Sequence, residues 1–194
     1  GDNFDASNIF TVAYSFFFRK KLVKKPYRQT LQWWDELNNG RNEIVPAIGG
    51  VDAHAMKIKK YIIPVTVFSY KYMFNTIVNE IYTHNSLSKD FAAAKKQILS
   101  AVKNGNNIIY NRLVCKKPPL EIYVENEKEV KYCGETLSFN KNLYINVNLP
   151  VRAIVNVIRN GVTYKTYRGK SLRLEIKQEG IYRIEAEING YGYF

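Results

Sequence analysis

Histidine and cysteine are scarce in this chain, and long apolar runs are missing. The 194 residues include two cysteines and two histidines. Cys115 and Cys133 lack the CxxC spacing of a structural zinc site, and so few cysteines exclude a disulfide-rich scaffold. We expect two free thiols in a cytoplasmic protein, with one disulfide as the alternative. Because no run of about 18 apolar residues occurs, no membrane-spanning helix is expected.

Two further absences limit the class of function. The sequence has no glycine-rich phosphate loop and no aromatic signature of an RNA-binding domain. It does not begin with Met, and it ends on the aromatic segment 191–194. We therefore expect both ends to be boundaries within a longer protein.

With 46% hydrophobic residues, the chain can bury one or two cores of ordinary size.

The formal net charge is +12, and most of the excess lies in the first two thirds of the chain. Residues 1–60 carry +4, residues 61–119 carry +6 and residues 120–194 carry +2. The densest basic stretches are the run 19–25 and Lys57, Lys59 and Lys60. A basic rim would concentrate a phosphorylated substrate, or it could follow a nucleic-acid backbone. An ordinary solvated face is the third interpretation.

One short motif carries most of the chemistry that the sequence suggests. Gly49 and Gly50 follow the apolar run 44–48, which we expect to be a buried strand, and Asp52 and His54 come next. In an extended chain, residues two apart project to the same side. Asp52 and His54 would then face one point, as two ligands of one metal ion do. A chance Asp-x-His triplet with a structural histidine is the alternative.

The sequence around this motif resembles a known family. Trp34-Asp35-Glu36-Leu37, Gly40-Arg41 and Ala47-Ile48-Gly49-Gly50-Val51-Asp52-Ala53-His54-Ala55 resemble the last conserved segment of the PHP (polymerase and histidinol phosphatase) family of metal-dependent phosphoesterases. The resemblance covers most of residues 27–112 and implies that Asp52 and His54 bind a divalent metal such as zinc, manganese or iron. The family's other ligands include an early His-x-His, which this chain lacks. The resemblance therefore implies the C-terminal part of such an enzyme, inactive alone.

The expected architecture is α+β with three regions. Residues 1–60 should form the terminal αβ portion of a PHP-type α/β barrel, because a helix over 26–39 precedes the apolar run 44–48. Asn39-Gly40 should end this helix in a left-handed conformation. Residues 61–117 should form a small α/β appendage that docks on the enzyme. One αβ unit cannot bury its own apolar surface, so residues 1–60 should dimerise or pack poorly.

Within the appendage, a strand through 77–81 should precede an amphipathic helix that Ser88 caps and Gly105 ends. Its apolar stripe comprises Phe91, Ala94, Ile98, Leu99 and Val102. His84 lies in a polar loop without an acidic neighbour in sequence, which favours a structural role over metal binding. Trp33 is expected to be core packing, with substrate stacking as the alternative.

Residues 118–194 should form an immunoglobulin-like antiparallel β-sandwich. Pro118-Pro119 marks the boundary. Apolar and polar residues then alternate over 120–125, 143–149, 172–177 and 182–188. Asn160-Gly161 predicts a type I′ hairpin turn.

Two classes of function remain. The first is a metal-dependent phosphoesterase acting on a phosphorylated substrate, to which this chain contributes the last ligand pair. The second is a non-catalytic module that binds carbohydrate, nucleic acid or protein. Outward-facing coplanar aromatic rings would favour the second, and the candidates are Tyr123, Tyr144, Tyr164 and Tyr167.

Overall fold

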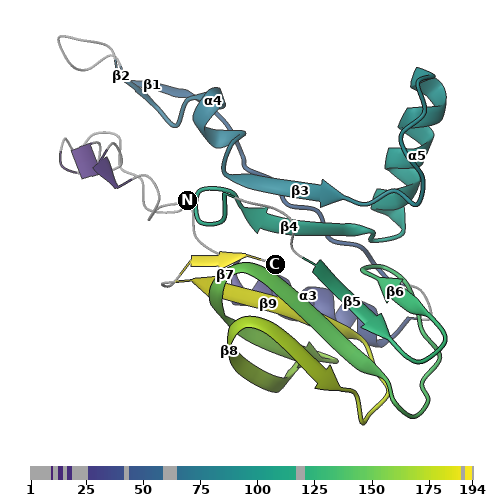
Figure 1. Cartoon of the computed structure of the whole chain (residues 1–194). Helices are drawn as coiled ribbons and strands as arrows, with labels where there is room; N and C mark the ends of the chain where they lie inside the picture. Colours follow the sequence, from purple (N-terminus) through teal and green to yellow (C-terminus); the bar gives the residue numbers. More distant parts are fainter. Residues whose placement is uncertain are drawn as a thin grey trace.

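The computed structural model describes residues 10, 13–14, 17–18, 26–41, 44–58, 65–116, 121–188 and 191–193. It combines a few helices with antiparallel strands, as the predicted α+β class requires (Figure 1). All strand pairs in the described ranges are antiparallel. The basic run 19–25, Lys59, Lys60 and the Pro118-Pro119 boundary lie outside the described residues.

The first long helix is α3 (Arg28–Asn39), where the sequence predicts one. The predicted left-handed stop is wrong, because Gly40 has φ −101°. Leu37 on this helix is exposed, whereas Asn38 is buried. Asn38 is drawn inward because its side-chain amide accepts from Val45 N at 2.8 Å and donates to Trp34 O at 2.9 Å.

Residues 44–50 do not form the predicted strand. Instead, polar side chains take the place of strand partners. Trp34 Nε1 donates to Val45 O at 2.7 Å, and Asn107 Nδ2 donates to Ala47 O at 2.9 Å. Asn79 forms a two-bond clamp, accepting from Gly49 N at 2.7 Å and donating to Gly49 O at 2.9 Å. The segment then leads to β1 (Met56–Ile58), which pairs with β2 (Val65–Val67).

A second unit consists of a strand pair with a helix between the strands. The one-turn helix α4 (Tyr70–Met73) precedes β3 (Ile77–Ile81), which pairs with β4 (Asn107–Asn111). Helix α5 (Phe91–Lys103) lies between them in sequence and is followed by Gly105 at φ +75°. The N-cap is Asp90 rather than the predicted Ser88, because Asp90 Oδ1 accepts from Ala93 N at 2.8 Å.

The C-terminal half forms one curled antiparallel sheet. Its strands are β5 (Glu121–Glu125), β6 (Val130–Tyr132), β7 (Tyr144–Arg159), β8 (Val162–Glu175), β9 (Tyr182–Ile188) and β10 (Tyr191–Tyr193). The first half of β7 pairs with β5 and the second half with β9, while β8 follows β7 along both halves. Asn160 and Gly161 have φ +48° and +81°, so the predicted I′-type turn is confirmed.

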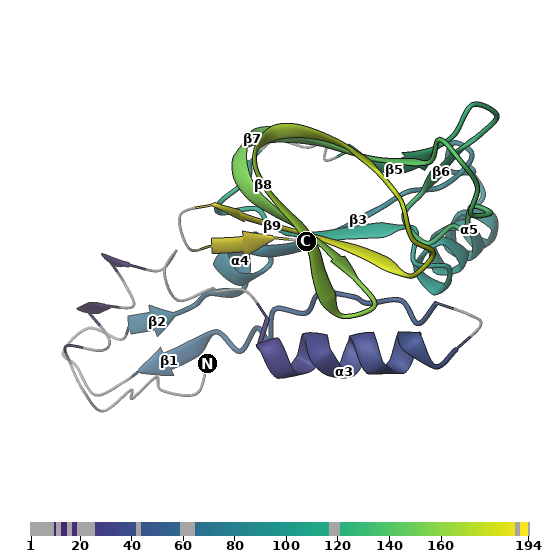
Figure 2. The ribbon, with the colours of Figure 1, turned by 90° about the horizontal axis from the view of Figure 1, so that it is seen from below.

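Two patterns that suggested separate strands belong to one long strand. The sequence around Pro150 separates 143–149 from 153–159, but β7 runs through both, with a register shift between Asn148 and Ala153. Proline is tolerated in a strand at such an irregularity. The shift lets β7 and β8 bend into a wide arch (Figure 2). Its inner side carries the core residues Ile145, Val147, Val155 and Val157.

The hydrophobic core includes residues from both sides of the predicted boundary at 118. Ile108, Tyr110 and Cys115 belong to the same buried cluster as Ile145 and Val155. Both cysteines are free thiols. No helix in the described ranges is long and apolar enough to cross a membrane.

Candidate functional site

The Asp-x-His motif lies on an exposed loop between the segment 44–50 and β1. Asp52 and Ala55 have φ +47° and +48°, so the loop turns at both residues. Gly49 is needed where this segment crosses the β3–β4 pair. A Cβ there would lie 2.6 Å from Cγ2 of both Ile77 and Ile109. The glycine therefore permits the close approach from which the loop starts.

Asp52 and His54 meet at this loop. His54 Nδ1 lies 3.4 Å from Asp52 Oδ1 and 2.8 Å from the Asp52 carbonyl oxygen. The side chains are 92% exposed for Asp52 and 72% exposed for His54. A carbonyl oxygen can only accept, so Nδ1 carries the proton that it donates. The other ring nitrogen, Nε2, then keeps its lone pair, which is the form in which histidine binds metal.

The described residues supply only these two ligands. A catalytic zinc ion takes three protein ligands and a water, and the described ranges contain no group of three His, Cys, Asp or Glu side chains placed to hold a metal. His84 is not near the motif in sequence, and its Nε2 lies 3.7 Å from Glu135 Oε1. The loop thus brings a carboxylate and an imidazole into contact, with the carboxylate beside Nδ1 of the ring.

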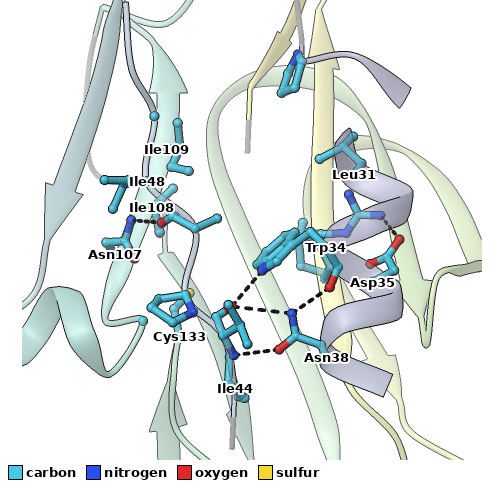
Figure 3. A pocket seen from close by; sticks show the side chains of 18 of the residues that line it. Leu31, Trp34, Asp35, Asn38, Ile44, Ile48, Asn107, Ile108, Ile109 and Cys133 are labelled. Carbon is cyan, nitrogen blue, oxygen red and sulfur yellow. Dashed lines mark hydrogen bonds and ion pairs between the residues drawn. The ribbon is translucent and has the colours of Figure 1, made fainter. Parts of the chain in front are cut away.

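A cavity lies elsewhere, between α3, the segment 44–50, β4 and β9. It has a volume of about 740 Å³, within the range of small-molecule sites. Leu31 and Trp34 line one side, and Ile48, Ile108 and Ile109 line the other (Figure 3). Trp33 also lines it but is more than half exposed, so the predicted core position of Trp33 is wrong. The apolar lining favours burial of apolar groups over catalysis.

The charged groups at this cavity neutralise one another. Arg183 Nη2 lies 2.8 Å from Asp35 Oδ2, and Arg183 also pairs with Glu185. The guanidinium lies over the Trp34 ring, 5.5 Å from its centroid. Burial raises the pKa of Asp35, and Arg183 partly opposes this. The sequence analysis missed this cluster because its members are 148 residues apart and no local pattern joins them.

A second buried polar cluster lies on the inner face of the β3–β4 pair. Burial raises the pKa of Glu80, while a hydrogen bond from Tyr82 opposes the shift. Burial also raises the pKa of Tyr82, and the Glu80 carboxylate adds to this. Burial raises the pKa of the nearby Cys133 thiol to about 11. The sequence contains one clue to this cluster. Glu80 lies in the apolar strand 77–81, where a carboxylate is unusual.

Each of the four tyrosines proposed as a binding platform contacts a neighbouring residue. The Tyr123 ring is tilted by 53° against Tyr132, and Arg173 covers Tyr144 at 3.6 Å from the ring centroid. Tyr164 packs edge-on against Tyr182 beside the core. Tyr167 folds back over Gly169.

Comparisons with protein-family models, with curated proteins and with solved structures find no match to this chain.

Proposed function

We propose that this chain is the C-terminal part of a PHP-type metal-dependent phosphoesterase. In this proposal it contributes the last ligand pair, Asp52 and His54. Residues 1–60 belong to the enzyme's barrel, residues 61–117 are an appendage and residues 118–194 are an immunoglobulin-like accessory domain. The free thiols of Cys115 and Cys133 fit a cytoplasmic enzyme.

The observation that supports the proposal is the geometry of the Asp52–His54 loop. The carboxylate and the imidazole lie 3.4 Å apart and both face solvent. The backbone carbonyl of Asp52 fixes the His54 tautomer that leaves Nε2 as a ligand. The Asp52 carboxylate contacts Nδ1 and not Nε2, so in this proposal one of the two side chains turns before both bind one metal ion.

These residues have defined tasks in the proposed site. Divalent metal bound there would activate water and neutralise charge on a phosphoryl group. Asp52 would supply a hard anionic oxygen and His54 a neutral nitrogen. The Gly49–Asn79 clamp would hold the start of the loop in place. Lys57, exposed on the following strand, adds positive charge that attracts a phosphorylated substrate.

The test compares metal content and phosphoester hydrolysis in two proteins, this chain and a version extended upstream. We expect the extended protein to hold divalent metal and to hydrolyse a chromogenic phosphoester. This chain alone should hold little metal and show little hydrolysis. Asp52→Ala and His54→Ala should each remove most of the activity of the extended protein. Unchanged activity in either variant would contradict the proposal, and so would full activity in the short chain. His84→Ala is the matched control.

A further inference from the structure

Residues 82–105 form a projection that we name the α5 finger. It consists of the loop 82–90 and α5, and it stands away from the sheets at one end of the β3–β4 pair (Figure 1). The C-terminal end of α5 is joined to β4 by Asn104, Gly105 and Asn106. A helix of 13 residues spans about 20 Å. The N-terminal end of α5 therefore lies far from the sheets.

Side-chain hydrogen bonds tie the loop to the helix. Gln97 Oε1 accepts from Ser88 N at 2.8 Å, and Gln97 Nε2 donates to Ser86 O at 3.2 Å. At the outer end, Asp90 caps the first turn of α5. The finger thus has a defined shape at its outer end, and the side chains there have defined positions.

The finger exposes large apolar side chains. Phe91 is 80% exposed, Leu99 57% and Leu87 53%. The sequence pattern had placed Phe91 and Leu99 on the buried stripe of this helix, but Ala101 is the only fully buried residue of α5. Phe91 begins the helix at the outer end, whereas Leu87 lies in the loop between the two serines that Gln97 holds beside the helix. Three exposed apolar side chains on one projection favour a contact surface over chance exposure.

Most charged side chains of the finger are lysines. Lys89, Lys95, Lys96 and Lys103 are all exposed. Phe91, Lys95, Leu99 and Lys103 follow one another at intervals of four, so basic and apolar side chains alternate along one side of the helix. Asp90 is the single acidic residue between Glu80 and Glu121, and its carboxylate is used as the cap. The surface therefore complements a negatively charged partner.

We propose that the α5 finger binds the surface of an anionic lipid bilayer. Leu87, Phe91 and Leu99 enter the boundary between headgroups and acyl chains, and the lysines contact lipid phosphates. Lysine stems lie along apolar surface while their ammonium groups reach toward polar groups. An acidic protein is the competing partner. The finger has no arginine for bidentate pairing with fixed carboxylates, and it is a projection and not a groove, so both features favour the lipid surface (Figure 1).

The test measures binding of the full chain to vesicles by flotation at physiological ionic strength. One set of vesicles contains phosphatidylcholine alone, and the other contains one part phosphatidylglycerol to three parts phosphatidylcholine. We expect binding only to the second set. A lysine near an anionic surface contributes about five-fold in affinity. K89Q/K95Q/K96Q should therefore reduce partitioning by roughly 100-fold.

A matched control removes three exposed charges elsewhere. K165Q/R168Q/K170Q on β8 has the same net charge as the finger variant and should retain most of the binding. Leu87→Ser with Phe91→Ser should reduce binding about ten-fold or more without loss of charge. Both residues are exposed, so the double variant should remain folded. Fluorescence from Phe91→Trp, after subtraction of the wild-type signal, should shift to the blue with anionic vesicles.

Three results would overturn the proposal. The first is no binding to the anionic vesicles, which would indicate that the finger binds an acidic protein instead of lipid. The second is an equal loss in the two triple variants, which would show that only the net charge of the chain matters. The third is unchanged binding by the Leu87 and Phe91 double variant, which would show that the tip does not enter the bilayer.

Discussion

Arg183 on β9 and Asp35 on α3 form an ion pair that joins parts of the chain 148 residues apart, with 2.8 Å between Nη2 and Oδ2. Both side chains are almost fully buried. Asn39 strengthens the same junction, since its Nδ2 donates to Asn160 O in the β7–β8 turn at 3.1 Å. Helix α3 is therefore positioned against the sheet by polar contacts beside an apolar cavity.

Asp35→Ala should destabilise the chain by about 2 kcal/mol, because Arg183 would lose one of its two carboxylate partners in a buried setting. Urea unfolding followed by Trp fluorescence measures this change. Glu36→Ala on the exposed side of the same helix is the control and should change stability little. Equal losses in the two variants would show that the ion pair does not hold α3.

Gly49→Ala should be destabilising, whereas Gly50→Ala should be tolerated. A Cβ at Gly49 would overlap with side chains of Ile77 and Ile109, while a Cβ at Gly50 would meet nothing within 4 Å. Overpacking of this kind costs about 1–3 kcal/mol. Urea unfolding should separate the two variants, and limited proteolysis should cut 44–50 faster in Gly49→Ala. Similar behaviour of the two would show that the segment does not lie close to the β3–β4 pair.

Local patterns predicted much of the secondary structure. The hairpin at Asn160-Gly161 needs two residues with positive φ, and this sequence favours them. The helix Phe91–Lys103 and the strand Tyr182–Ile188 were found by their hydrophobic period. In each case the residues that decide the structure are neighbours in sequence.

The errors arose where distant side chains decide the structure. The apolar run 44–48 looks like a strand, but the side chains of Trp34, Asn38 and Asn107 bond to its backbone instead. Phe91 fits a buried helical stripe, yet no element of the described chain covers it. The closeness of Asp52 and His54 was predicted from an extended chain, although the contact is made through a turn at Asp52. Their metal role stays a prediction.

Cys133 should react slowly with iodoacetamide in the folded protein. Burial raises its pKa to about 11 from an ordinary value of 9.0, and the Glu135 carboxylate adds to the shift. Since the thiolate is the nucleophile, the reaction at mildly alkaline pH should be about 100-fold slower than in urea. Mass spectrometry of Cys115 and Cys133 peptides over time provides the measurement. Fast labelling of Cys133 without urea would show that the β5–β6 edge opens readily.

Glu80→Gln should stabilise the protein at neutral pH by about 1 kcal/mol, since Oε2 of Glu80 is buried without a hydrogen-bond partner among the described residues. The raised pKa means that the folded state binds the proton more tightly than the unfolded state, whose value is near 4.5. Protonation therefore stabilises the wild type as pH falls through the raised pKa toward 4.5, and this contribution is lost as pH rises again.

The advantage of Glu80→Gln should accordingly shrink on acidification and vanish below the unfolded-state pKa. Unfolding free energies from urea titrations at several pH values would follow this change. Glu36→Gln, an exposed change with the same loss of charge, should show no such trend. A stability difference for Glu80→Gln that is independent of pH would contradict the raised pKa, and a loss of stability at neutral pH would show that the fold uses the ionised carboxylate.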